Sequence, residues 1–398
     1  MKMLELLAPA GDWPSLRAAI DSGADAIYFG IKELNMRMKT KNFKLSELNK
    51  IIKLCRKNKI KCYLTLNSII YDNELNKLKN IIIKAKQAKI DAIIAWDLAV
   101  INLANRYKIP IHLSTQASVS NSESLRLYKK LGIKRVILAR ELNLKQIKSI
   151  NFPKEVFIHG ALCYSISGRC FLSQDLYNFS ANRGECLQVC RRTYKLTDLE
   201  TNKEINVNNH FLLSAKDLCT LPFLDKILKT NPISLKIEGR NRSPEYVYTV
   251  TKCYKEALNL IKTKKFNKEN INKLMDELKT VYNRKFSSGF YLGLPTADDL
   301  TDIYGSAATK RKAAIGQIIN YYSNKSVAVI ELKHNLKLND NIIIIGNTTG
   351  VVKQKVTSME ILNKKVDHAD KGQAVAILTN KIVRKKDKVY LIRDSYFP

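Results

Sequence analysis

Eight short apolar runs, separated by segments with helical periodicity, most strongly limit what this chain can fold into. Between most of the runs lie Lys-rich stretches with apolar residues at i, i+3 and i+4, such as LSELNKIIKLCRK and NELNKLKNIIIKAKQA. Strands that alternate with helices pair in parallel, and eight such strands can close into a barrel. We therefore predict an α/β fold with a TIM-like (β/α)8 barrel over residues 1–295. The apolar runs are residues 4–8, 26–30, 61–66, 92–96, 111–115, 135–139, 155–160 and 233–239.

An open, doubly wound parallel sheet is the alternative arrangement of the same elements. Sheets of that type that bind dinucleotides carry a Gly-rich G-x-G-x-x-G turn after the first strand. The first apolar run is followed here by PAGDWPS, which lacks that turn. The barrel is therefore favoured.

The periodicity changes from helical to alternating near residue 313. Residues 282–309 are rich in Gly, Ser and Thr, and from Ala313 onward apolar and polar residues alternate in runs such as AIGQIINYY, SVAVIEL and KVYLI. Turn signals such as LND, GNTTG and ADKG separate these runs. The pattern predicts a linker over residues 296–312 and a small all-β barrel over residues 313–398.

The chain carries a large excess of positive charge. It has 68 Lys and Arg against 36 Asp and Glu, a formal net charge of +32. Lys, Asn and Ile are all abundant, as in proteins from AT-rich genomes, but that bias does not remove carboxylates. An excess of this size favours a polyanionic partner, and we expect a nucleic acid.

Membrane and secretory locations are disfavoured by the sequence. No run reaches 18 consecutive apolar residues, and no basic amphipathic helix with an aromatic apolar face stands out. The first residues, MKMLELLAPAGDWPS, include no long apolar segment before a small-residue cleavage site. We therefore expect a cytoplasmic protein without a membrane partner, in a compartment that keeps ordinary thiols reduced.

Four of the eight cysteines gather in residues 159–191, directly after the seventh predicted strand. Structural zinc sites mostly present two close pairs of ligands, and only the second pair here is close. Iron–sulfur clusters accept four thiolates at irregular spacing. We therefore expect an iron–sulfur cluster, with zinc as the less favoured metal. The four cysteines are Cys163, Cys170, Cys186 and Cys190, and Cys219 is the only rival for the fourth ligand position.

Polar residues cluster at the ends of several predicted strands. In barrels of this type the active site is built at the C-terminal ends of the strands. We expect these side chains to converge on one rim beneath the Cys-rich segment. They are Glu5, Asn67, Asp97, Ser114, Gln116, Arg140, Glu141, Lys236, Glu238 and Arg240.

Several segments resemble the peptidase U32 family. The resemblance is carried by HGALCYSISGRCFLSQ and NRGECLQVCR in the Cys-rich segment, and by ELLAPAGDWPSLRAAIDSGADAIYFG, STQASVSN, LAREL, SAKDL and LKIEGRNRSPEYV. It covers nearly all of the first 295 residues, and the C-terminal part resembles a barrel found on some members. The better-understood branches are similar to oxygen-independent hydroxylases with a [4Fe-4S] cluster on four such cysteines.

The resemblance implies three possible substrates. One branch hydroxylates the wobble uridine of tRNA with prephenate as the oxygen source, another a cytidine of rRNA, and a third the ubiquinone ring. An RNA substrate accounts for the net charge of +32, whereas a quinone does not. The rRNA branch tends to be much longer, so we expect formation of 5-hydroxyuridine in tRNA.

The expected hydroxylation of RNA with a small anionic donor suggests roles for the rim residues. Arginine and lysine bind carboxylates well, and a glutamate can accept or donate a proton, so they suit a small anionic donor. We expect catalytic roles for Arg140, Glu141, Glu238 and Arg240. We expect substrate-binding roles for Asn35, Arg37, Gln116, Lys236 and His159.

A peptidase is the alternative enzyme class. The five histidines form no H-E-x-x-H motif, which a metallopeptidase of that type would need. His159 and Cys163 could form a base and nucleophile pair, but a position beside the metal cluster is favoured for this histidine. The other histidines are His112, His210, His334 and His368.

Overall fold

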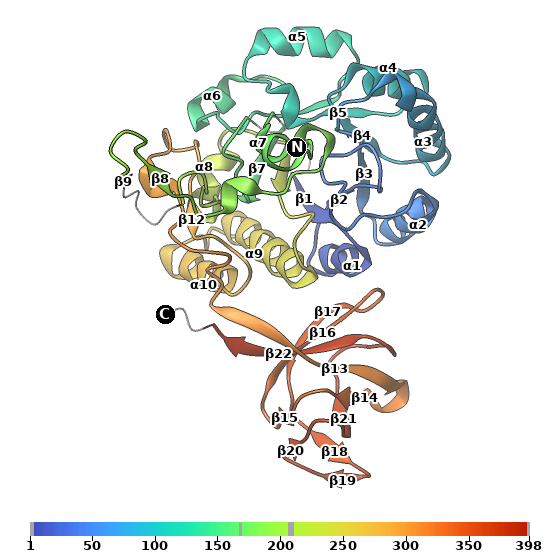
Figure 1. The fold of residues 1–398 in the computed structure, drawn as a ribbon. Helices are drawn as coiled ribbons and strands as arrows, with labels where there is room; N and C mark the ends of the chain where they lie inside the picture. The colour runs from blue at the N-terminus through green and yellow to red at the C-terminus, as the bar shows by residue number, and fades with distance from the viewer. Residues whose placement is uncertain (1–3, 167–168, 206–210, 396–398) are drawn as a thin grey trace.

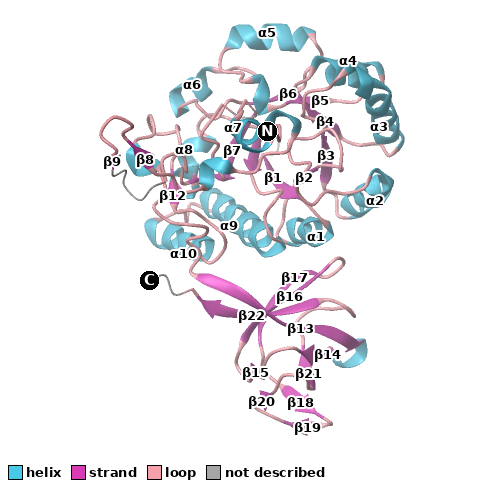
Figure 2. Ribbon diagram, viewed as in Figure 1, coloured by secondary structure: helices cyan, strands magenta, loops and turns pink. Residues whose placement is uncertain are grey.

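The structure, a computed structural model, describes residues 4–166, 169–205 and 211–395. Figure 1 shows two parts, a barrel ringed by helices and an antiparallel sheet below it. Figure 2 shows that helices surround the first part, while strands dominate the second. None of the described helices is long and apolar enough to cross a membrane.

Eight parallel strands among the described residues close into a barrel. They pair in the order β11-β1-β2-β3-β4-β5-β6-β7, and β11 also pairs with β7, which closes the ring. The predicted TIM-like fold class is therefore confirmed. The strands are β1 (Glu5–Ala10), β2 (Ala26–Phe29), β3 (Lys61–Thr65), β4 (Ala92–Ala95), β5 (Ile111–Leu113), β6 (Arg135–Ile137), β7 (Lys154–Gly160) and β11 (Ser234–Ile237).

Helices connect most of the strands and bury one apolar face against them, as their 3.6-residue periodicity predicts. On α2, for example, Ile51, Ile52 and Cys55 are buried, while the Lys and Arg residues between them face solvent. The helices are α1 (Trp13–Asp21), α2 (Leu48–Lys57), α3 (Leu75–Gln87), α4 (Leu98–Arg106), α5 (Ser122–Lys130), α6 (Leu144–Ser149), α8 (Leu224–Leu228), α9 (Pro244–Lys262) and α10 (Lys268–Lys279).

Acidic side chains at two strand ends begin the helices that follow. Asp12 accepts a hydrogen bond from the backbone N–H of Ser15 at 2.9 Å and begins α1. Asp97 accepts one from the N–H of Ala99 at 2.9 Å and begins α4. Such a cap satisfies a helix N–H that has no partner within the helix. Asp97, which the sequence predicts on the rim, therefore has a structural role.

A series of buried ion pairs lies inside the barrel. Arg135 Nη1 lies 2.6 Å from Glu5 Oε1 and 3.1 Å from Glu155 Oε2. Lys236 Nζ lies 3.1 Å from Glu155 Oε1. Pairing is required here because an unpaired buried charge costs several kcal/mol. Glu5 is the first residue of β1, so it lies at the end of the barrel opposite to the predicted rim.

The Cys-rich segment leaves the barrel after β7, as predicted. It contains α7 (Leu172–Tyr177) and is followed by the hairpin of β8 (Leu196–Thr197) and β9 (Glu204–Ile205). The chain returns through β10 (Asp217–Cys219), which pairs antiparallel with β7, and β12 (Phe286–Ser287) pairs with β10. The segment therefore covers the end of the barrel at which β7 finishes. His210 lies outside the described residues.

The C-terminal part is an antiparallel sheet curled around its own core. The order is β17-β16-β22-β13-β14-β21-β18-β19, and within residues 310–395 no pairing joins the two edge strands. The curl of the sheet, rather than a closed ring of hydrogen bonds, therefore encloses the core. The strands of this sheet are β13 (Lys310–Tyr322), β14 (Val327–Leu332), β16 (Asn341–Gly346), β17 (Gly350–Lys355), β18 (Met359–Ile361), β19 (Lys364–Lys365), β21 (Ala374–Leu378) and β22 (Lys388–Asp394). The short strands β15 (Leu336–Lys337) and β20 (His368–Ala369) pair with each other in a separate two-stranded sheet.

The C-terminal sheet has an apolar core of its own, and one of its hairpins also packs into the core of the barrel. Ile343, Ile345 and Val351 from the hairpin β16–β17 belong to the core cluster of the barrel. The hairpin lies against α1, where Gly350 has a φ of 72° and an added Cβ would lie 2.4 Å from Cγ of Arg17. Packing therefore fixes how the sheet sits on the barrel.

Candidate active site at the barrel mouth

A cavity of about 100 Å³ lies at the C-terminal ends of the barrel strands. Its lining comes from strands on opposite sides of the ring, β2 and β3 on one side and β6 and β7 on the other, and from the loops that follow them. This is the rim on which the sequence predicts the site. Seven of the predicted site residues line it, namely Arg37, Gln116, Arg140, Cys163, Lys236, Glu238 and Arg240.

Glu238 is the carboxylate of this cavity. Its side chain is 13% exposed, and Arg37 Nη2 lies 3.3 Å from Oε1. The hydroxyl of Tyr28 lies 3.2 Å from Oε2. Burial alone would raise the pKa of Glu238, but the positive charges of Arg37, Arg140 and Arg240 outweigh burial and hold the pKa below its usual value. Glu238 is therefore ionised near neutral pH and can accept a proton or a hydrogen bond.

Arg240 is a buried cation held by neutral groups. Its guanidinium donates to the side-chain oxygens of Thr65 and Asn35. Burial lowers the pKa of Arg240 to about 10, so the group remains charged at neutral pH. An added Cβ at Gly30 would lie 2.9 Å from both terminal nitrogens of Arg240, so glycine makes room for this side chain. Asn35 therefore orients Arg240.

Arg140 is half-buried and lacks an acidic partner. Its guanidinium stacks 4.2 Å from the centre of the Phe157 ring and donates to the carbonyl of Ala161 at 3.1 Å. No carboxylate of the described residues lies within 4.0 Å of it. Three arginines thus surround a single carboxylate, Glu238, because Glu155 is already paired with Lys236 and Arg135. The cavity has surplus positive charge that suits a small anion.

Lys236 and Gln116 are both committed to contacts within the barrel. Besides its pair with Glu155, Lys236 places its ammonium 4.0 Å from the centre of the Tyr28 ring. Burial lowers the pKa of Lys236, and Glu155 opposes that shift. Gln116 donates to the carbonyl of Asn67 at 3.2 Å. Their role here is to shape the cavity floor and wall.

A second cavity, of about 360 Å³, lies under the Cys-rich segment and adjoins the first. The two cavities share Met36, Arg37, Arg140 and Cys163 in their linings. All four predicted metal ligands, Cys163, Cys170, Cys186 and Cys190, line this second cavity. Each is a free thiol, and each is at least partly exposed.

The donor set suits a thiolate-bound cluster in composition. Burial raises the pKa of Cys190, Arg191 opposes that shift, and the other three thiols raise it further, so the four thiols influence one another. Within the described residues, however, no three His, Cys, Asp or Glu side chains stand at metal-binding separations. The four cysteines are thus gathered in one cavity without a preformed cage, and the ligand set stays a prediction.

Cys219 does not reach this cavity. It is buried on β10, with its sulfur 3.7 Å from the hydroxyl of Tyr254 and 3.8 Å from the sulfur of Met275. Burial raises the pKa of Cys219 to about 11, which disfavours the thiolate that a metal needs. The structure offers no contact between Cys219 and the other four cysteines.

Besides Asn35, which is fully buried and contacts the site through Arg240, two predicted site residues line neither cavity. Glu141 is exposed and lines neither cavity, although its neighbour Arg140 lines both. His159 is 2% exposed and packs among aromatic rings, including those of Tyr254 and Tyr246. Burial lowers the pKa of His159 to about 3, so this histidine is neutral. Neither side chain touches the cavity in this structure.

Some cavity residues were not predicted from the sequence. Tyr28, Thr65 and Phe157 lie inside the apolar runs and therefore read as core, yet they line the cavity. Tyr28 is the second-to-last residue of β2, and Thr65 is the last residue of β3. A polar group so close to the C-terminal end of a barrel strand is the signal that could have identified them.

The described residues contain no hydrogen-bonded pair of a histidine with a Ser, Thr or Cys nucleophile. His112 lies beside Tyr63 inside the barrel, and burial lowers its pKa. His159 contacts Tyr254, and His368 contacts Asp370. The pair of His159 with Cys163 is not formed, so the geometry does not favour a serine or cysteine peptidase.

Similar proteins carry two kinds of name. A protein called collagenase from Porphyromonas gingivalis is 42% identical over 97% of this chain and 97% of its own length. The tRNA hydroxylation protein P1 of Bacillus subtilis is 30% identical over 87% of this chain and 84% of its own length. The 23S rRNA 5-hydroxycytidine C2501 synthase of Escherichia coli is 36% identical over 65% of this chain but only 40% of its own length.

The family assignment rests on a match to a family model that covers most of the barrel. The model of the family described as Peptidase family U32 matches residues 11–301, which include the Cys-rich segment and every residue that lines the barrel-mouth cavity. The chain therefore belongs to peptidase family U32.

Proposed function

We propose that this protein is an oxygen-independent RNA hydroxylase that forms 5-hydroxyuridine at the wobble position of tRNA, with prephenate as the oxygen donor. The observation that carries the proposal is the junction of two cavities, one rich in arginine and one lined by four cysteines. The first suits a small dicarboxylate and the second a thiolate-bound metal group. The relatives named for tRNA and rRNA hydroxylation support RNA as the substrate class.

The chain's own residues divide the work as follows. Arg140 and Arg240 bind the carboxylates of the donor, because neither has an acidic partner within 4.0 Å among the described residues. Hydroxylation breaks the C–O bond of the donor's hydroxyl and the C5–H bond of the base, and it forms C5–OH. The base is oxidised by two electrons, the donor is reduced by the same two electrons, and one proton must leave the base. Glu238, ionised and adjacent to Arg37, accepts that proton. The base is flipped out of its strand to reach the cavity.

The metal group is a [4Fe-4S] cluster held by Cys163, Cys170, Cys186 and Cys190. When bound, it supplies one-electron chemistry that the amino-acid side chains cannot supply. Zinc, the alternative metal for four thiolates, would not provide such electrons.

The proposal is tested with protein purified and reconstituted without oxygen. Unmodified tRNA is incubated with this protein and prephenate, and the nucleosides are analysed by mass spectrometry. We expect a gain of one oxygen atom on uridine that requires the donor. Hydroxylated cytidine in rRNA would assign the rRNA activity instead, and no hydroxylated nucleoside in either RNA would reject the proposal.

A peptidase is the second candidate because of the relative named collagenase. Digestion of gelatin by the same protein tests it directly. We expect no cleavage, because the described residues form no nucleophile–histidine pair. If gelatin is cleaved, the Cys163→Ala and Arg140→Ala variants are tested next. Cleavage that both variants retain, and that a general peptidase inhibitor blocks, would come from a contaminating peptidase.

A further inference from the structure

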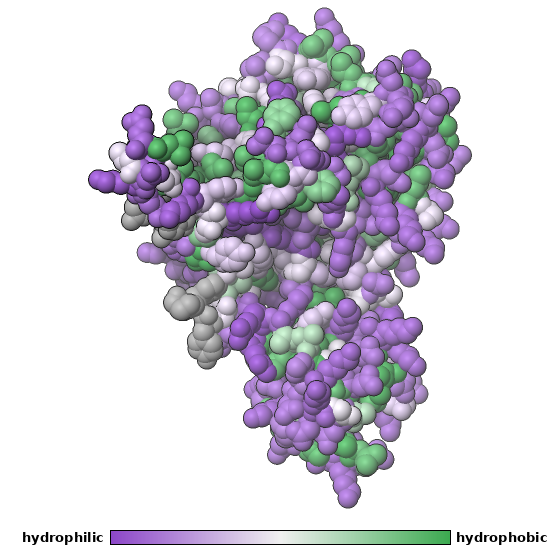
Figure 3. All heavy atoms as spheres, in the orientation of Figure 1, coloured by the Kyte–Doolittle hydropathy of each residue, from purple (hydrophilic) through white to green (hydrophobic). Residues whose placement is uncertain are grey.

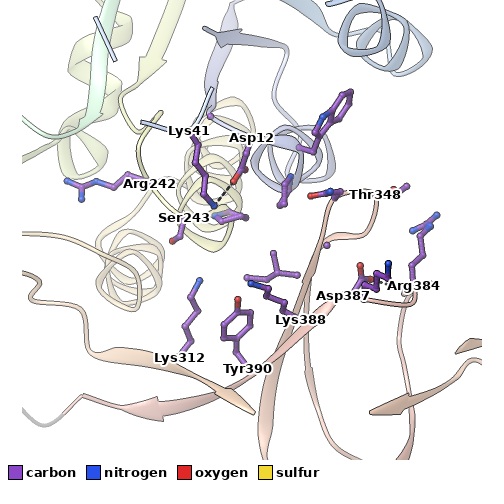
Figure 4. Close-up of a pocket in the computed structure, with 18 of the residues that line it drawn as sticks. Asp12, Lys41, Arg242, Ser243, Lys312, Thr348, Arg384, Asp387, Lys388 and Tyr390 are labelled. Atoms are coloured by element: carbon purple, nitrogen blue, oxygen red, sulfur yellow. Dashed lines mark hydrogen bonds and ion pairs between the residues drawn. The ribbon is translucent and has the colours of Figure 1, made fainter. Parts of the chain in front are cut away.

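A groove of about 1000 Å³ runs between the barrel and the C-terminal sheet (Figure 4). Its barrel wall consists of residues 11–14 and 240–244, where α1 and α9 begin, and of residues 40–41. Its other wall consists of the tight turn between β16 and β17 and of residues 384–388, which lead into β22. The hairpin β16–β17, which packs into the core of the barrel through Ile343, Ile345 and Val351, holds the two walls in place.

Basic side chains dominate the groove. Eight Lys and Arg residues line it against two acids, Asp12 and Asp387. Both acids already have structural partners. Asp12 caps α1 and pairs with Lys41 at 3.1 Å. Asp387 accepts hydrogen bonds from the hydroxyl of Thr349 and from the backbone N–H of Arg384. The groove therefore presents a large uncompensated positive charge.

The charge is concentrated in a turn that we name the basic turn, Arg384, Lys385, Lys386, Asp387 and Lys388. Its four basic side chains are exposed, and none lies within 4.0 Å of a carboxylate of the described residues. Not every cation of the junction is free in this way, since Lys310 pairs with Asp394 and Lys312 with Glu245. The four cations of the basic turn therefore make up most of the unpaired charge of the groove.

The basic turn is held in a fixed position. Gly346 approaches Asp387 so closely that an added Cβ would lie 1.7 Å from its Oδ1. Gly350, at the other end of the same hairpin turn, packs against Arg17 of α1. The hairpin therefore links the basic turn to the barrel. Figure 3 shows hydrophilic side chains over much of both parts on the face in view.

The groove leads to the candidate active site. Arg240 lines both the groove and the barrel-mouth cavity. Thr40 and Asn241 line both the groove and the cavity of the four cysteines. The first turn of α9 also faces the groove, and its N-cap, Ser243, makes no side-chain capping bond.

We propose that the groove binds the phosphate backbone of RNA and guides one nucleotide from the basic turn to the barrel mouth. The inference rests on the proposed function for the identity of the polyanion. Regularly spaced phosphates match a row of unpaired cations along a concave surface. A flat membrane surface cannot enter a groove between two walls.

The test neutralises two groove lysines, Lys385→Gln with Lys386→Gln, in the full chain. A matched control makes the same charge change on the far side of the barrel, Lys129→Gln with Lys130→Gln at the end of α5. The affinity for tRNA is measured at several salt concentrations. We expect the groove variant to bind about tenfold more weakly at physiological salt, with a salt slope lower by about 1 to 2. The control should change by less than about twofold.

Equal losses in both double variants, or no loss in the groove variant, would overturn the inference. Lys386 has a φ of 74°, so Lys385→Gln with Lys388→Gln provides a second groove variant that leaves this position intact. Loss of binding to vesicles of anionic lipid, with tRNA binding retained, would assign the groove to a membrane and also contradict the inference. Groove-dependent tRNA binding without any hydroxylated product would instead reject only the proposed function.

Discussion

At the residue scale, position at the C-terminal end of a barrel strand identified the charged side chains of the barrel mouth. It did not predict the direction in which each side chain points. Arg140 and Glu141 are adjacent in the sequence, yet only Arg140 lines the cavities. His159 lies one position before the end of β7 and faces α9 instead. Side-chain direction at a strand end depends on the local twist and on the loop that follows, and neither is encoded by spacing alone.

Arg140→Ala should abolish or strongly reduce hydroxylation while the fold is retained. The side chain has no acidic partner among the described residues, so its loss removes the stacking contact with Phe157, worth about 0.5–1 kcal/mol, and one hydrogen bond to the carbonyl of Ala161, worth about 1 kcal/mol. Product is measured by nucleoside mass spectrometry and stability by thermal melting. Glu141→Gln is the matched control and should leave the product unchanged. Equal activity of the two variants would remove Arg140 from the site.

Glu155→Gln should lower the free energy of unfolding by about 3 kcal/mol, because Lys236 would lose its buried carboxylate and Arg135 one of two. Glu123→Gln, on the exposed face of α5, is the control and should cost less than about 1 kcal/mol. Urea unfolding of the three proteins provides the comparison. A cost for Glu155→Gln no larger than the control would show that the ion pairs contribute little.

The stability difference between the wild type and Glu155→Gln should also depend on pH. Burial would raise the pKa of Glu155, but Lys236 and Arg135 outweigh burial and lower it. A carboxylate with a lowered folded-state pKa stabilises fully above its unfolded pKa of about 4.3 and loses that effect as the pH falls through the folded value. The stability difference between wild type and Glu155→Gln should therefore be constant from pH 7 to about 5 and shrink below pH 4.3. A constant difference down to pH 3.5 would contradict this assignment.

At the element scale, periodicity was sufficient for the barrel but not for the docking of the C-terminal sheet. Each of the eight apolar runs overlaps an observed strand, because fully buried parallel strands read as short apolar runs. The contact of Gly350 with Arg17 joins residues more than 300 positions apart, and no local pattern reports it. Spacing in the sequence also does not distinguish a residue of the active-site rim from a helix N-cap. Asp97 was predicted on the rim, but it caps α4.

Gly346→Ala should displace the basic turn, because the new Cβ would collide with the carboxylate of Asp387. We expect a loss of about 1–3 kcal/mol in stability and weaker tRNA binding. Gly372→Ala is the control in the same sheet, since nothing lies within 4 Å of its added Cβ and only its φ of 89° is strained. Stability is followed by urea unfolding and binding by titration. Unchanged tRNA binding in Gly346→Ala would show that the turn's position is unimportant.

At the scale of the whole molecule, three concave features adjoin one another: the groove, the barrel mouth and the cavity of the four cysteines. The sequence predicted the rim and the Cys-rich segment above it, since both follow from the order of strands. The groove forms where the barrel packs against the C-terminal sheet, and no sequence pattern predicts that packing. The composition therefore indicated only a polyanionic partner and not where it binds. The RNA backbone, the donor and the metal group that we propose would therefore bind in cavities that adjoin one another.

The cluster gives a direct visible readout. Protein purified without oxygen should be brown, with about four irons per chain if one cubane cluster is bound. Alanine in place of Cys163, Cys170, Cys186 or Cys190 should each remove the colour, whereas Cys219→Ala should keep it, because Cys219 is buried on β10 away from the cavity. Absorption spectra and iron analysis provide the measurement. Colourless protein with stoichiometric zinc after reconstitution would refute the cluster.

Mass spectrometry of tRNA nucleosides from cells that lack the protein decides whether this chain hydroxylates tRNA. Complementation with the wild type, Arg140→Ala and Cys163→Ala links the result to the two adjoining cavities. We expect 5-hydroxyuridine and the nucleosides derived from it to disappear in these cells, and we expect only the wild-type chain to restore them. Undiminished 5-hydroxyuridine in the deletion strain, or full restoration by both variants, would contradict this expectation.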